Sequence, residues 1–126
     1  MLLALLLAVQ LQQPHFRNTF ATAAESTIDT ISAVNLSASA ADYDAAMKSA
    51  QTARENLKQM ATEPGETDVV SAVNALYFAV SACHIQAVDN TDTTACRGTM
   101  TRARNRAMEV LGKHKVNGGW VDGPPV

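Results

Sequence analysis

The two cysteines of the chain, Cys83 and Cys96, lie on either side of a short polar segment, and His84 follows the first of them. Such a group could form a disulfide bond, or it could hold a metal ion through both sulfurs and the imidazole. Adjacent residues of a helix point about 100° apart, so Cys83 and His84 do not readily face one ion. The midpoint between the cysteines is Asp89–Asn90, in a predicted turn between two antiparallel helices, so the sulfurs lie opposite each other. The spacing therefore predicts a Cys83–Cys96 disulfide, with two buried free thiols and a metal site as the alternatives.

A disulfide is typical of exported proteins, and the first residues of the chain favour the same compartment. Residues 1–13 form an apolar segment that begins MLLALLLAVQL and ends before Pro14. This run has the length of the hydrophobic region of a signal peptide, and it is shorter than the roughly 20 residues that span a bilayer. No Lys or Arg precedes it, so a retained turn or two of helix is the alternative. We predict a secreted or periplasmic protein without a transmembrane span, with a cytoplasmic protein as the alternative.

A second group that could do chemistry is Tyr77 with His84, because residues seven apart share one face of a helix. They could line a small pocket between helices, and a carrier of a small apolar ligand or haem is one alternative function. The favoured interpretation is a histidine at a helix interface that bonds to a tyrosine or to the backbone, because a single histidine is weak evidence for a site. The sequence accordingly predicts no cofactor.

A third group is basic. Residues 97–115 hold six of the ten Lys and Arg residues against one acidic residue, Glu109. Such a segment could bind nucleic acid, so a cytosolic nucleic-acid-binding protein is a second alternative function. No aromatic side chains that could stack on bases lie between the basic ones, which favours a solvated helix face. Two of these residues, Arg97 and Arg104, flank the apolar stripe, where they could pair with acids of a neighbouring helix. The basic face consists of Arg97, Arg102, Arg104, Arg106, Lys113 and Lys115.

The common catalytic patterns are missing from the chain. It contains no Gly-rich phosphate loop, no H-E-x-x-H and no G-x-S-x-G. The net charge of −2 provides no overall attraction to nucleic acid or to a membrane surface. We therefore predict a protein that is not an enzyme and that acts by binding.

Four amphipathic stretches must position these residues. Apolar residues recur at three- and four-residue steps, and alanine is abundant, both of which are typical of helices. The expected helices cover about 15–34, 41–61, 67–88 and 91–111, with Ser39 and Thr67 as N-caps and Arg54 on a solvated face. Short links between them predict an all-α, antiparallel up-down-up-down four-helix bundle over residues 14–112. Residues 113–126 are predicted to form an irregular tail rich in Gly and Pro.

The expected helix 67–88 is apolar on two sides, because Phe78 and Ile85 lie roughly opposite its main stripe. That main stripe consists of Val69, Val73, Leu76 and Val80. A helix that is apolar on two sides is expected to be covered on two sides. The cover could be the N-terminal segment, Trp120 of the tail or a second molecule. If export removes the segment, Phe78 and Ile85 are expected to bind a second copy or a partner protein, and this is the function that the sequence predicts.

Overall fold

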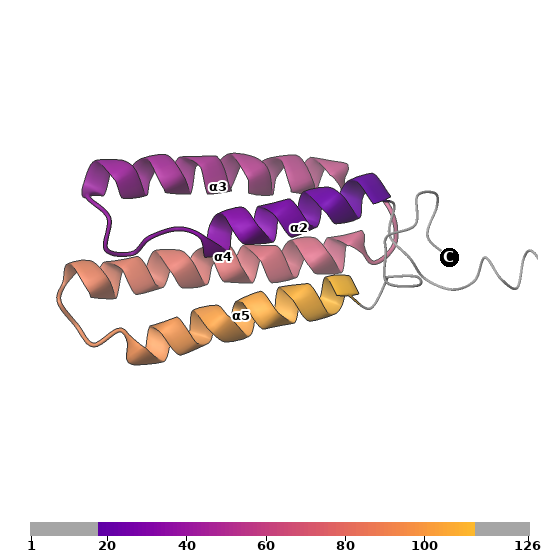
Figure 1. Cartoon of the computed structure of the whole chain (residues 1–126). Coiled ribbons are helices and arrows are strands. Elements are labelled where there is room, and N and C mark those ends of the chain that lie inside the picture. The colour runs from indigo at the N-terminus through magenta and orange to yellow at the C-terminus, as the bar shows by residue number, and fades with distance from the viewer. Residues whose placement is uncertain (1–17, 113–126) are drawn as a thin grey trace, which may run out of the picture.

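Four helices and no strand make up the described part of the protein, which is residues 18–112 in a computed structural model of the 126-residue chain. The helices are α2 (Asn18–Ser32), α3 (Ala40–Met60), α4 (Glu66–Val88) and α5 (Thr94–Gly112) (Figure 1). They confirm the predicted all-α four-helix bundle. The apolar segment 1–13, the start of the first expected helix and the tail 113–126 lie outside the described residues, as do Lys113, Lys115 and Trp120.

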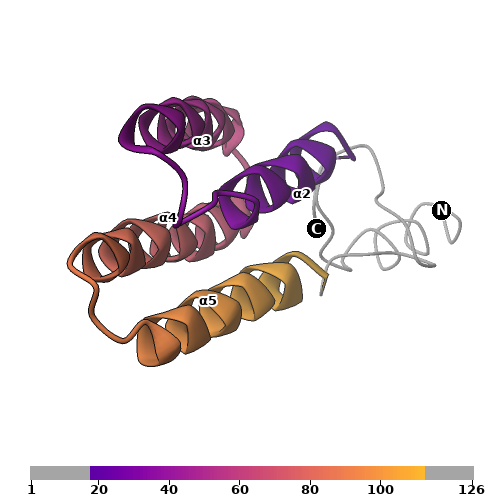
Figure 2. The ribbon, with the colours of Figure 1, turned by 60° about the vertical axis from the view of Figure 1, so that its left-hand side comes forward.

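Consecutive helices run antiparallel, so the chain passes up, down, up and down through the bundle (Figure 1). The cross-section is flattened, because α2 and α4 each contact the other three helices, whereas α3 and α5 do not contact each other. Figure 2 shows α3 and α5 on opposite sides of the α2–α4 pair. Helix α4 therefore contacts α2 on one face, α3 on one flank and α5 on the other flank. None of the described helices covers its remaining face.

The core lies where the helices meet, and it follows the predicted three- and four-residue spacing. Phe20, Ile28 and Leu76 are among its large side chains, each with at most 1% exposure. Ala24 and Ala50 are also fully buried, and their small side chains let the helix backbones approach closely. Each large apolar side chain that folding removes from water contributes about 1.5–3 kcal/mol, so these residues are the main source of the stability of the bundle.

The start of α3 agrees with the prediction and the start of α4 does not. The Ser39 hydroxyl accepts a hydrogen bond from the Asp42 backbone N–H at 3.2 Å, as an N-cap does. Thr67, however, is not a cap, since α4 already begins at Glu66. The capping position is Gly65, whose φ of 86° lies in the left-handed region that favours glycine.

A buried carboxylate organises the link between α3 and α4. Glu66 is fully buried, and its Oε1 accepts hydrogen bonds from the backbone N–H groups of Thr62 and Glu63 at 3.1 and 3.0 Å. It reaches back into the preceding loop, whereas an N-cap side chain reaches forward into its own helix. The sequence prediction missed this role, because the apolar spacing that locates a helix does not show which side chain bonds back to the preceding loop.

Helix α5 begins at Thr94, two or three residues later than predicted. The Asp92 Oδ1 atom accepts hydrogen bonds from the backbone N–H and from the hydroxyl of Thr94, at 3.0 and 2.7 Å. These two bonds lower the pKa of the Asp92 carboxyl. An aspartate that bonds the backbone two residues ahead holds the chain in a turn, so the residues just before Thr94 stay outside the helix.

Candidate functional site

The structure joins Cys83 of α4 to Cys96 of α5 in a disulfide, with an S–S distance of 1.99 Å and a Cα–Cα distance of 5.3 Å. Cys83 is fully buried, and Cys96 is half-buried. The bond leaves neither sulfur as a thiolate for a metal ion. Within residues 18–112, no three His, Cys, Asp or Glu side chains gather where they could hold one. A disulfide at this position is suited to an oxidising compartment.

His84 packs at the interface between α3 and α4. Its ring stacks on the ring of Tyr43, with 3.3 Å between the ring centroids and 6° between the ring planes. Burial raises the pKa of the Tyr43 phenol, and a hydrogen bond with the Ser81 side chain opposes that shift. One face of the imidazole is therefore covered by Tyr43 of the neighbouring helix, while Tyr77 has a different partner.

Tyr77 lies under an arginine that the sequence prediction placed in solvent. The guanidinium carbon of Arg54 is 4.4 Å from the centre of the Tyr77 ring and 5.3 Å from that of Phe78. Its Nη1 atom donates a hydrogen bond to Asn74 Oδ1 at 3.1 Å. With only 16% of its side chain exposed, Arg54 is not on a solvated face, so that prediction is wrong. Arg54 follows the buried Met47 by seven residues, which places both on one helix face, and this spacing was the available signal.

The uncovered face of α4 carries the large apolar side chains that are most exposed among the described residues. Phe78, Ile85 and Val88 are 59%, 61% and 63% exposed. Phe78 and Ile85 share a stripe along α4 with three small residues. All five residues are exposed, and successive members of the stripe are four or three residues apart. We call this stripe the α4 outer face, and it consists of Ser71, Ala75, Phe78, Ala82 and Ile85. Val88 lies beside the stripe, about 80° round the helix axis from Phe78 at its middle.

Neither Tyr77 nor His84 lines either of two hollows that described residues form. One is an open depression of about 540 Å³ along a single helix, α3. The other is a crevice of about 120 Å³ between α2, α4 and α5, lined by Ser32, Leu76, Met100, Thr101 and Arg104. The crevice has the volume of a few water molecules, which suits the buried Ser32 hydroxyl, since that group has no protein partner. Small-molecule sites are enclosed and usually occupy roughly 300 Å³ or more, so neither hollow resembles a haem pocket.

The four arginines of the basic face that belong to the described residues are all exposed. Arg104 pairs with Asp29 of α2 at 3.6 Å, as expected for a residue beside the apolar stripe. Arg97 makes no such ion pair with another residue of 18–112, and its Nε donates a hydrogen bond to the Thr93 hydroxyl at 3.0 Å. These contacts are those of a solvated helix surface with weak ion pairs.

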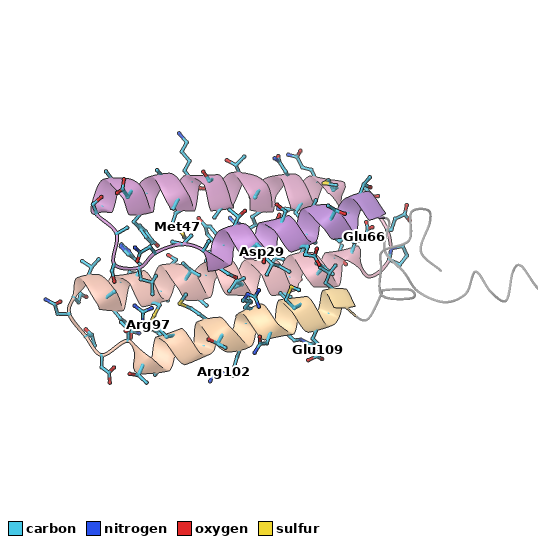
Figure 3. The ribbon with its side chains drawn as sticks, viewed as in Figure 1. Asp29, Met47, Glu66, Arg97, Arg102 and Glu109 are labelled. Carbon is cyan, nitrogen blue, oxygen red and sulfur yellow. A yellow bond between two sulfur atoms is a disulfide. The ribbon has the colours of Figure 1, made fainter. Side chains whose placement is uncertain are left out.

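Reversing two of these charges tests the solvated-face interpretation. Arg102 bonds the Thr99 hydroxyl and Arg106 bonds the Glu109 carboxylate, and Figure 3 shows Arg102 and Glu109 on the outer side of α5. Because exposed ion pairs stabilise weakly, we expect Arg102→Glu with Arg106→Glu to change the free energy of unfolding by less than about 0.5 kcal/mol. Urea unfolding measures the difference, and a loss of more than about 1 kcal/mol would show that these guanidinium groups support the fold.

Among the described helices, α4 is the one that is long and apolar enough to cross a membrane, with a mean hydropathy of 1.4. The core helix of a water-soluble bundle passes the same test of length and composition. In this fold α4 contributes fully buried side chains such as Val73 and Val80 to the core. The high mean hydropathy of α4 therefore comes from two groups of apolar residues, the buried core stripe and the α4 outer face.

The chain matches no protein-family model, and comparisons with curated proteins and with solved structures found no match.

Proposed function

We propose that this is a small exported protein that acts without catalysis, by binding another protein through the α4 outer face. The observation that carries the proposal is the position of Phe78 and Ile85, which are 59% and 61% exposed on a face that none of the described helices covers. Single exposed apolar residues are common on soluble proteins, whereas a continuous apolar stripe is typical of an interaction site. Export is supported by the Cys83–Cys96 disulfide and by the apolar N-terminal segment.

The surroundings of Phe78 also support a role in binding. Its ring packs edge-on against Tyr77, with 5.4 Å between centroids and 86° between planes, and Arg54 lies beside both rings. Arg54 is itself held by its hydrogen bond to Asn74. Aromatic residues and arginine are enriched at protein interfaces, and a ring that is already held in place loses less entropy when a partner binds.

Site-specific photo-crosslinking tests this proposal in the cells that produce the protein. In one version of the full chain a photoreactive residue replaces Ser71, at the edge of the α4 outer face. In the control version it replaces Ser26, an exposed serine on the outer side of α2. We expect protein adducts from position 71 and few from position 26, and we expect the protein to be recovered outside the cytoplasm. Equal yields of adducts from the two positions would refute binding through the α4 outer face.

A further inference from the structure

We propose that the partner is a second copy of this chain, and that two molecules pair through antiparallel α4 helices about a two-fold axis at the level of residue 80. This inference rests on the proposed function, because it names the partner of the same surface. Four observations support it: the contrast between α4 and α2, the spacing of the α4 outer face, the order of residue sizes along it, and its lack of charge.

Helix α2 shows that the fold does not require an apolar outer face. Like α4, α2 contacts all three other helices and has one face that they leave uncovered. The exposed residues on that side of α2 are polar: Thr19, Thr22, Ser26 and Asp29. The α4 outer face has the equivalent place in the bundle, yet Ser71 is its only polar residue. Its apolar character therefore does not follow from core packing.

The spacing of the α4 outer face is that of a coiled-coil seam. Its residues follow one another at steps of four, three, four and three from Ser71 to Ile85. A stripe that repeats every seven residues keeps facing a neighbouring helix along its whole length. The core stripe of α4 has the same steps, and it consists of Val69, Val73, Leu76, Val80 and Cys83. Helix α4 thus presents one seam to its own bundle and a second seam outward.

The order of residue sizes on the α4 outer face matches an identical, antiparallel partner. In a pair with its two-fold axis at the level of residue 80, Phe78 lies opposite Ala82 of the partner subunit, and Ala75 lies opposite Ile85 of the partner subunit. Each large side chain therefore meets an alanine, and the symmetry repeats both contacts. A parallel pair would instead place Phe78 beside its own counterpart and would leave gaps at the level of each alanine.

The absence of charge also suits a self-complementary surface. Near a two-fold axis a charged side chain lies close to its own counterpart, so like charges would oppose pairing. From Val69 to Val88, α4 contains no Asp, Glu, Lys or Arg. The nearest cation to Phe78 that the structure shows is Arg54 of α3, which bonds Asn74 and lies over Tyr77.

The dimensions of α4 indicate a reversible dimer. Its 23 residues rise about 35 Å, and a helix with its side chains is about 10 Å wide. The face of α4 alone therefore provides less area than the roughly 800 Å² per partner of a standard stable complex. We expect association that grows with protein concentration.

Sedimentation velocity of the full chain, from low micromolar to millimolar concentration, tests the pairing. We expect the mean mass to rise from that of one chain to that of two and then to stop. The variant Phe78→Ser with Ile85→Ser is expected to dimerise at least about tenfold more weakly, because it loses both large groups of the seam. Val88→Ser is the matched control, since Val88 is just as exposed but lies beside the seam. It should dimerise like the parent, and circular dichroism should show both variants folded.

Exchanging the sizes of two residues tests the register. Phe78→Ala leaves a gap opposite Ala82 of the partner subunit, and Ala82→Phe places two large rings opposite each other. Each single change is therefore expected to weaken the dimer. The two changes together restore a large side chain opposite a small one, so the double variant should recover most of the affinity of the parent. A double variant weaker than either single variant would overturn this register.

A parent chain that stays monomeric at every concentration, or a double-serine variant that dimerises like the parent, overturns the second-copy assignment. In that case a cross-link from position 71 to a different protein keeps the proposed function and changes only the partner. A cross-link from position 71 to residues 1–13 or to Trp120 of the same chain identifies an internal cover and overturns both.

Discussion

Replacing Cys83 and Cys96 together with alanine is expected to lower the free energy of unfolding by about 3 kcal/mol and to leave the protein helical. The two residues are 13 apart in sequence, and closing a loop of that size removes conformational freedom from the unfolded chain. For a domain of this size the loss corresponds to a decrease in Tm of roughly 10–20 °C. Helical structure persists because the large buried side chains, such as Phe20 and Leu76, are unchanged.

Thermal unfolding of the oxidised parent, the reduced parent and the double-alanine variant separates the two effects of this change. Reduction alone removes the crosslink, whereas the alanine substitutions also remove the fully buried sulfur of Cys83 from the core. We expect reduction to lower the free energy of unfolding of the parent by most of the expected total of about 3 kcal/mol. The double-alanine variant should show a smaller further decrease. Two free thiols in mass analysis of protein from an oxidising compartment would contradict the crosslink.

The second large effect is expected at Glu66. The substitution Glu66→Ala should lower the free energy of unfolding by about 2–4 kcal/mol, because the backbone N–H groups of Thr62 and Glu63 lose a charged acceptor. The carboxylate also lies in the first turn of α4, where the positive end of the helix dipole favours a negative charge. Urea unfolding at neutral pH measures the loss.

Two variants act as controls for Glu66. Glu66→Gln keeps an oxygen acceptor but removes the charge, so it should be intermediate between the parent and Glu66→Ala. Asp68→Ala removes the other acid from the first turn of α4, but Asp68 is exposed, so the expected loss is at most about 1 kcal/mol. If Glu66→Ala and Asp68→Ala had equal effects, the buried hydrogen bonds would contribute nothing beyond the helix dipole.

Much of the fold could be predicted from short-range pattern. The three- and four-residue spacing identified four helices, and the structure has them at Asn18–Ser32, Ala40–Met60, Glu66–Val88 and Thr94–Gly112. Two of the boundaries that were wrong, the starts of α4 and α5, depend on side chains that bond to a loop, Glu66 before α4 and Asp92 before α5. Such bonds compete with helix formation, so they can move a helix end by a few residues. They leave no trace in the apolar spacing from which the helices were predicted. Helix α2 also ends at Ser32, about two residues earlier than predicted.

The candidate site could be predicted in part. The apolar spacing placed Phe78 and Ile85 opposite the main stripe of α4, and the structure leaves both exposed. Spacing along one helix could not show that Arg54 of α3 would border this face. That contact depends on how α3 packs against α4, which is a property of the packed helices.

The sequence by itself determined which residues share a helix face, because a fixed rotation of about 100° per residue orders the side chains of every helix. It also determined that Cys83 and Cys96 can meet, since a short turn makes the two flanking helices antiparallel. Only the tertiary structure decided that His84 stacks on Tyr43 of α3, and that α4 keeps a face that the other described helices leave uncovered. These features depend on the distances and rotations between helices, and such distances result from packing the whole core at once, with residues that lie far apart in the chain.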